Sequence, residues 1–164
     1  MTTVASEAKT EAVLQTLHLK KILVPLDFSV ASNTAVEFAR RVSGVTGGNI
    51  IFLHVIEPDS SLAFESLPSI CSDELKANAE ENLRSVVRAA RKAGDEGATS
   101  VMRSGLARHE IVEAAKDLDV DLIILAAHGH TGWKHFCLGS TAERVVRAAP
   151  CPVLVVREKE QKLI

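Results

Sequence analysis

The chain has 164 residues, of which 46% are hydrophobic and 24% charged, and its formal net charge is −2. These values are typical of one soluble globular domain with a sizeable core. The weak negative charge, the single Trp and the lack of Tyr argue against a nucleic-acid surface or a broad attraction to an anionic membrane. No apolar run approaches the roughly 20 residues that cross a bilayer. Three cysteines without a C-x-x-C pair predict a reducing, cytoplasmic setting instead of a disulfide framework.

The first half of the chain alternates short apolar runs with helical patterns. Residues 1–18 form a polar leader that lacks the apolar region of a signal peptide. The segment KKILVPLD (20–27) predicts a buried strand that leaves its sheet at a Pro and an Asp. From Ser32 to the glycine cluster GVTGGN, helical spacing joins Ala35, Phe38, Ala39 and Val42. The run IIFLHVI (50–56) predicts a second buried strand, and 57–72 has the composition of a surface loop.

The second half continues the alternation. From Asp73 to Gly94 the pattern predicts a long helix, whose apolar face consists of Leu75, Ala79, Leu83, Val86, Val87 and Ala90. The remaining predicted elements are a weak strand at 98–105, a helix at 107–118, a buried strand at 120–127, a helix at 140–149 and a strand at 152–156. Buried strands separated by amphipathic helices predict one doubly wound α/β domain with a parallel sheet, over 19–157. Residues 158–164 form a short polar tail.

Two strand ends carry unusual residues. In doubly wound sheets, ligands bind at the carboxyl ends of strands where the strand order reverses. The first strand ends in Pro25, Leu26 and Asp27, and the fourth runs into AAHGHTGWKHFCLGST (126–141). If these two strands are neighbours, Asp27 and the glycine-containing loop share one crevice.

The loop has the composition of an anion site. Its glycines allow close approach of the backbone to a ligand. The sequence STAE at 140–143 fits a capping box, which predicts Ser140 as the N-cap of the last helix and leaves first-turn N–H groups for an anion. Glu143 would repel a phosphate unless its carboxylate folds back onto the Ser140 N–H. Gly followed by Ser is also common before a helix that binds no ligand. Asp27 taken alone could serve only to form a turn.

Other interpretations of the loop have less support from the sequence. The spacing of its three histidines does not form a helical H-x-x-x-H pair, and no acidic ligand stands nearby, which argues against a metal site at His128, His130 and His135. Cys137 and His135, two residues apart on a loop, do not define a nucleophile and its base. Trp133 and Lys134 fit either a lid or a partner surface. The sequence also lacks a Walker loop and a G-x-G-x-x-G motif after its first strand.

The chain resembles the universal stress proteins over residues 19 to 157. KKILVPLDFS is similar to the opening strand and acidic loop of that family, IIFLHVIEP to its second strand, and LGSTAERVVRAAPCPVLVVR to its closing helix and strand. The resemblance implies a Rossmann-like five-stranded parallel sheet in the order 3-2-1-4-5. The ATP-binding members carry Gly, two residues, Gly, nine residues, then Gly-Ser or Gly-Thr. Gly129, Gly139 and Ser140 match this pattern, whereas Ala126 replaces its first glycine.

The same resemblance implies roles for the residues at the crevice. Asp27 would meet the ribose of ATP, and Val55 would frame adenine with the backbone near Pro25, Leu26 and Ala126. The phosphates, with Mg²⁺, would be held by Gly129, His130, Thr131, Gly132, Gly139, Ser140 and Thr141. The apolar strand 152–156 would lie at the sheet edge and pair with a second copy in a homodimer.

Three functional hypotheses follow. The first is a cytoplasmic ATP-binding regulator of a stress response; lacking an evident general base, it has at most slow hydrolysis or self-phosphorylation. The second is a regulatory dimer of the same fold that binds partners but no nucleotide, which Ala126 favours. The third is a redox module that uses Cys137 or Cys151.

Overall fold

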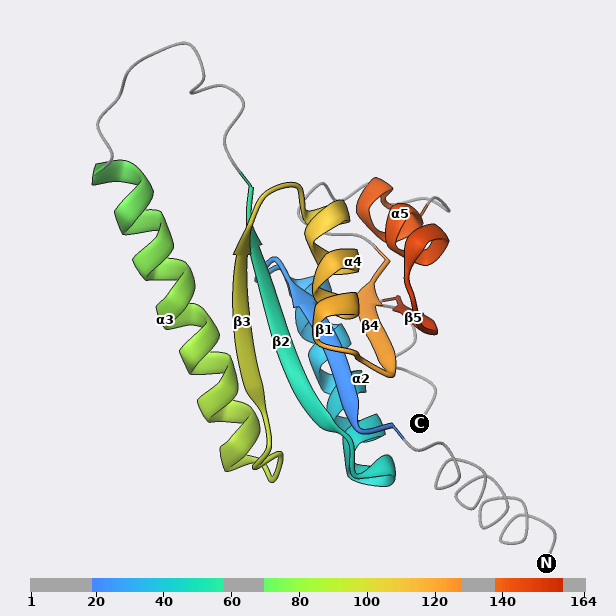
Figure 1. Cartoon of the computed structure of the whole chain (residues 1–164). Coiled ribbons are helices and arrows are strands. Elements are labelled where there is room, and N and C mark those ends of the chain that lie inside the picture. The colour runs from blue at the N-terminus through green and yellow to red at the C-terminus, as the bar shows by residue number, and fades with distance from the viewer. Residues whose placement is uncertain (1–18, 58–69, 128–137, 158–164) are drawn as a thin grey trace, which may run out of the picture.

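The computed structural model describes residues 19–57, 70–127 and 138–157. Its elements alternate along the chain: β1 (Lys21–Leu26), α2 (Val30–Thr46), β2 (Asn49–Ile56), α3 (Ile70–Lys92), β3 (Thr99–Ser104), α4 (Ala107–Asp117), β4 (Leu122–Ala126), α5 (Ser140–Ala148) and β5 (Val153–Val156). The five strands form one parallel sheet in the order β3-β2-β1-β4-β5 (Figure 1). This arrangement confirms the doubly wound fold expected from the sequence.

Each face of the sheet is covered by two helices. On one face α2 and α3 pack over a buried cluster that includes Val24, Phe52 and Ile124. On the other face α4 and α5 pack over Leu23, Leu53 and Ile123, and Figure 1 shows these two helices in front of the sheet. Alternation of side chains along each strand produces this division, because successive residues point to opposite faces.

The helix α3 differs from its predicted form at its first residues. It begins at Ile70, three residues before the expected start at Asp73. Ala79, Leu83 and Ala90 of its apolar face are buried against the sheet as expected, but Leu75 is 60% exposed. In the described ranges of the chain, no helix combines the length and apolarity that crossing a membrane requires.

Candidate nucleotide site at the carboxyl edge of the sheet

The order of the strands brings the two unusual strand ends to one place. β1 and β4 are neighbours, although β2, β3 and their helices separate them in the sequence. The chain runs outward from β1 to β3 on one side and from β4 to β5 on the other, so the β1–β4 boundary is the topological switch point. Asp27 follows β1 at this edge, and the N–H of Gly139 donates to the carbonyl of Ala127 at 3.0 Å, which ties the start of α5 to the end of β4.

Pro25 ends the hydrogen-bonded ladder at this boundary. β1 pairs with β2 over six residues, but in the described chain its pairing with β4 comprises only Ile22 and Leu23. The carbonyl of Lys21 accepts from the N–H of Asp121, so alternate residues of β1, including Pro25, point toward β4. Proline has no N–H to donate. The paired register of β1 with β4 is therefore short, and Pro25 supplies no N–H to it where the crevice is expected.

Asp27 is half-buried and already takes part in a tight turn. Its Oδ1 accepts from the N–H of Ser29 at 3.0 Å and from the Ser29 hydroxyl at 2.6 Å. Ser29 is in turn the N-cap of α2, where its Oγ accepts from the N–H of Ser32 at 3.1 Å. Asp27 therefore does shape the turn, as one of the two interpretations of the sequence had it. Its bonds to Ser29 fix the carboxylate at the carboxyl edge of the sheet.

Two residues that the sequence analysis did not single out lie beside this turn. The His54 Nδ1 lies 2.8 Å from the carbonyl oxygen of Leu26, its register partner on β1. The Phe28 ring packs on the imidazole with 4.5 Å between ring centroids. Phe28 also has a φ of 61°, in the left-handed region that bulky residues avoid. The polar His54 within the apolar run IIFLHVI was the sequence signal that pointed here.

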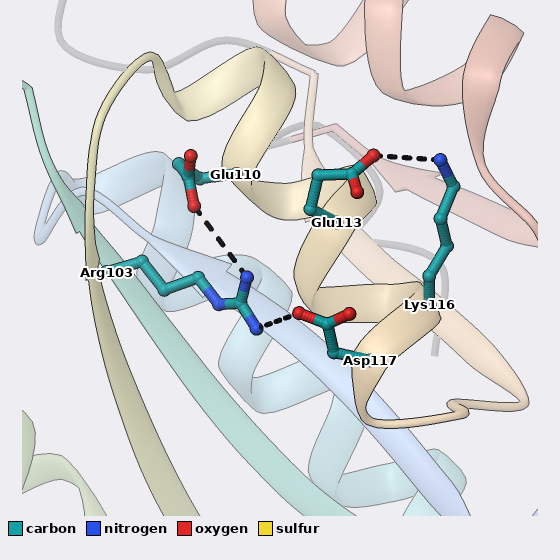
Figure 2. A network of polar contacts seen from close by, with 5 residues as sticks. All are labelled: Arg103, Glu110, Glu113, Lys116 and Asp117. Carbon is teal, nitrogen blue, oxygen red and sulfur yellow. Dashed lines mark hydrogen bonds and ion pairs between the residues drawn. The ribbon is translucent and has the colours of Figure 1, made fainter.

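Val55 lies on the face of the sheet covered by α4 and α5. It packs at the margin of that cluster and is the register partner of Arg103 on β3. Figure 2 shows the Arg103 guanidinium between two acidic residues of α4, with 2.7 Å to an Asp117 oxygen and 3.8 Å to a Glu110 oxygen. The acidic partners neutralise this cation, so Arg103 stabilises the contact between β3 and α4.

The methyl group of Ala126 lies on the opposite face from Val55. Ala126 packs at the margin of the cluster under α2 and α3 and pairs with Val156 of β5. Phe28 and Asp119 are the non-glycine residues with positive φ in the described ranges, so Ala126 has an ordinary strand conformation. An alanine therefore fits at this position without strain, although the family pattern has glycine there.

The start of α5 differs from the predicted capping box. The N-cap is Gly139, with φ −60° and ψ 150°, and no side chain caps the helix there. The N–H of Glu143 donates to the Gly139 carbonyl at 2.8 Å, so Ser140 is the first helical residue. The Glu143 carboxylate pairs with Arg147 one turn later, at 3.0 Å, because an i,i+4 ion pair is available on the exposed face. The predicted role of Ser140 as N-cap was wrong.

The corrected cap still leaves the first N–H groups of α5 without intrahelical acceptors. A helix has no intrahelical acceptor for its first N–H groups, which here belong to Ser140, Thr141 and Ala142. The helix dipole places positive potential at the same point. Glu143 no longer competes for the Ser140 N–H, since its carboxylate is turned to Arg147. The other predicted phosphate ligands, Gly129, His130, Thr131 and Gly132, lie outside the described residues, as do His128, Trp133, Lys134, His135 and Cys137.

Comparison with known proteins agrees with this geometry. The model of the universal stress protein family matches residues 18–157. The chain belongs to the universal stress protein family. Among curated members, universal stress protein MJ0531 of Methanocaldococcus jannaschii is 33% identical over 145 residues, which cover 87% of this chain and 85% of that protein.

Solved structures of universal stress proteins share the fold. The structure of hypothetical protein MJ0577 has a TM-score of 0.76 and 30% identity, and covers 86% of this chain and 97% of its own. The Archaeoglobus fulgidus universal stress protein in complex with dAMP has a TM-score of 0.58 and 21% identity, covering 85% and 98%. At 21% identity the likeness concerns the fold.

Proposed function

We propose that this universal stress protein binds ATP with Mg²⁺ in the crevice between the carboxyl ends of β1 and β4. The observation that carries the proposal is the tie between Gly139 and Ala127, which holds the open end of α5 at the switch point beside the strand of Asp27. A helix N-terminus supplies N–H donors and positive potential for a phosphate. A carboxylate on the neighbouring strand is suited to accept from ribose hydroxyl groups.

The remaining contacts of the proposed nucleotide follow the roles that the family resemblance implies. Val55, Pro25 and Leu26 would frame adenine, and Ser140 and Thr141 would donate to phosphate oxygens together with Gly129, His130, Thr131 and Gly132. The methyl of Ala126 lies on the face under α2, away from Val55, which supports retention of nucleotide binding despite the missing glycine. The dAMP complex of the Archaeoglobus protein supports an adenine nucleotide at the level of the fold.

In this proposal the nucleotide sets a regulatory state of a cytoplasmic homodimer that acts in a stress response. β5 is an apolar strand at the sheet edge, and its unpaired side is suited to a second copy. Hydrolysis or self-phosphorylation would be slow.

Calorimetric titration with Mg·ATP tests the proposal. We expect a 1:1 heat of binding for the wild type and a loss of about tenfold or more in affinity for Asp27→Ala, which removes a charged hydrogen-bonding group. The control is Asp119→Asn, in the turn at the opposite edge of the sheet, where asparagine tolerates the positive φ of 49°. Wild-type protein that gives no heat and releases no nucleotide on denaturation would contradict nucleotide binding.

A regulatory dimer without nucleotide is the second candidate. The engagement of the Asp27 carboxylate by Ser29 favours it, because a ribose would have to share those oxygens. The two candidates differ in a thermal-unfolding experiment. ATP raises the melting temperature in the first and leaves it unchanged in the second.

A further inference from the structure

The turn after β1 holds a conformation that its own residues do not favour. Phe28 stands in the left-handed region at φ 61°, directly after the carboxylate proposed to meet the ribose. Such a conformation persists only where the surroundings over-determine it, and it is found most often at functional sites. The groups that hold the turn are therefore candidates for a role in the site.

His54 holds this turn from the neighbouring strand. Its Nδ1 lies 2.8 Å from the Leu26 carbonyl oxygen, and its ring supports the Phe28 ring. A carbonyl oxygen only accepts, so Nδ1 must carry the proton of this hydrogen bond. In the neutral ring Nε2 is then unprotonated. His54 thus fixes both residues that flank Asp27, one through its carbonyl and one through its ring.

We propose that His54 is a positioning residue of the nucleotide site, an inference that rests on the proposed function. The carbonyl of Lys20 accepts from the N–H of Asn49, so Lys20 faces β2. Because every second residue of a strand directs its carbonyl to the same side, the Leu26 carbonyl also points toward β2. The register that pairs Leu26 with His54 places the Val55 N–H opposite the same carbonyl, so the imidazole of His54 is an additional, side-chain donor to it. We infer that this added bond, together with the ladder, holds the peptide plane before Asp27 and with it the direction in which the carboxylate leaves the sheet.

A pair of variants separates the hydrogen bond from the ring contact. In His54→Asn the amide nitrogen stands near the position of Nδ1, so the donor is kept and the ring is lost. In His54→Phe the ring is kept and the donor is lost. We expect His54→Phe to weaken Mg·ATP binding about five- to tenfold, which is the effect of one hydrogen bond, and His54→Asn to restore most of the affinity.

The matched control is Val87→Ala, at a buried position of α3 in the core cluster against which Phe28 packs. This variant should lower the melting temperature and leave the ATP affinity unchanged, measured where all variants are folded. Equal affinities for wild type, His54→Asn and His54→Phe would overturn the positioning role. The positioning role would also be overturned if Val87→Ala and His54→Phe lowered the melting temperature equally and lost the same ATP affinity.

A readout without ligand separates this inference from the proposed function. In mildly alkaline buffer, ¹⁵N NMR of the nucleotide-free protein should find Nδ1 of His54 protonated and Nε2 unprotonated. Amide exchange at Ser29 and Ser32, whose N–H groups bond to Asp27 and Ser29, should accelerate in His54→Phe more than exchange in β2. A protonated Nε2 with an unprotonated Nδ1 would overturn the inference. Wild-type protein that binds no nucleotide but gives these spectra would contradict the proposed function alone.

Discussion

Cys151 is a thiol whose surroundings oppose ionisation. It is partly buried just before β5, and burial raises its pKa, with a smaller contribution in the same direction from the negative charge of Asp121. The thiolate is the reactive form of cysteine, so a raised pKa makes a poor redox nucleophile. This environment weighs against the redox hypothesis as far as Cys151 is concerned.

In a Cys71→Ser, Cys137→Ser background, Cys151 should react slowly with iodoacetamide at neutral pH. The rate should rise only above the ordinary pH range of thiol ionisation, because the folded protein disfavours the thiolate. Alkylation rates measured over a range of pH give the midpoint pH of Cys151 ionisation. The same variant in urea provides the control, and a midpoint in the folded protein below that of the unfolded chain would contradict the assignment.

Single residues were the least predictable part of this protein. Asp27, Val55 and Ala126 could be assigned to strand ends because apolar runs mark where strands stop. The bond from His54 to Leu26 and the packing of Phe28 depend on the register of β1 and β2, which no local pattern encodes. The capping box at Ser140 failed for a different, local reason, since the i,i+4 ion pair of Glu143 with Arg147 competed with it.

At the scale of elements, a glycine in the last turn of α2 and one after the helix differ in how much space surrounds them. A β-carbon added at Gly44 would meet nothing within 4 Å, whereas one at Gly48 would lie 2.4 Å from the carbonyl oxygen of Leu19. Gly44 lies within α2, where glycine is less favourable than alanine. Gly48 lies in the close approach between the chain before β1 and the start of β2.

We therefore expect opposite effects from the same substitution at these two positions. Gly44→Ala should raise the free energy of unfolding by about 0.5–1 kcal/mol. Gly48→Ala should lower it by about 1–3 kcal/mol, because backbone must move to admit the methyl group. Urea denaturation measures both. Equal stabilities for the two variants would contradict this account of the two glycines.

Element types and order were predictable, and boundaries less so. The alternation of strand and helix follows from the period of the apolar residues, which is why all nine described elements were expected. The first turn of α3 was assigned to a loop, because its residues lack an apolar period before Leu75, and the exposure of Leu75 fits that weakness.

At the scale of the whole molecule, the outer edge of β5 would govern the proposed association of two copies. The carbonyls of Pro152 and Val156 accept from β4, so by alternation Val153 and Val155 direct their backbone groups outward. A strand that pairs with a second copy would use these outward groups. The polar residues Thr99 and Ser104 at the ends of β3 make the other edge less suited to pairing.

Val155→Pro should convert the proposed dimer to a monomer. Proline removes an outward N–H without removing a bond to β4, so the fold should persist. Light scattering coupled to size-exclusion chromatography measures the mass, and Val155→Thr, which keeps the N–H, is the control. A Val155→Pro protein that remains dimeric would show that another surface holds the copies together.

The shortened ladder beside Pro25 bears on how a ligand enters and leaves. Since the described pairing of β1 with β4 comprises only Ile22 and Leu23, widening the gap between their far portions disturbs little of the ladder, and the sheet on either side keeps its own pairing. In the proposed site, uptake and release of nucleotide would then proceed on the rapid timescale of small relative motions instead of waiting for a strand to detach.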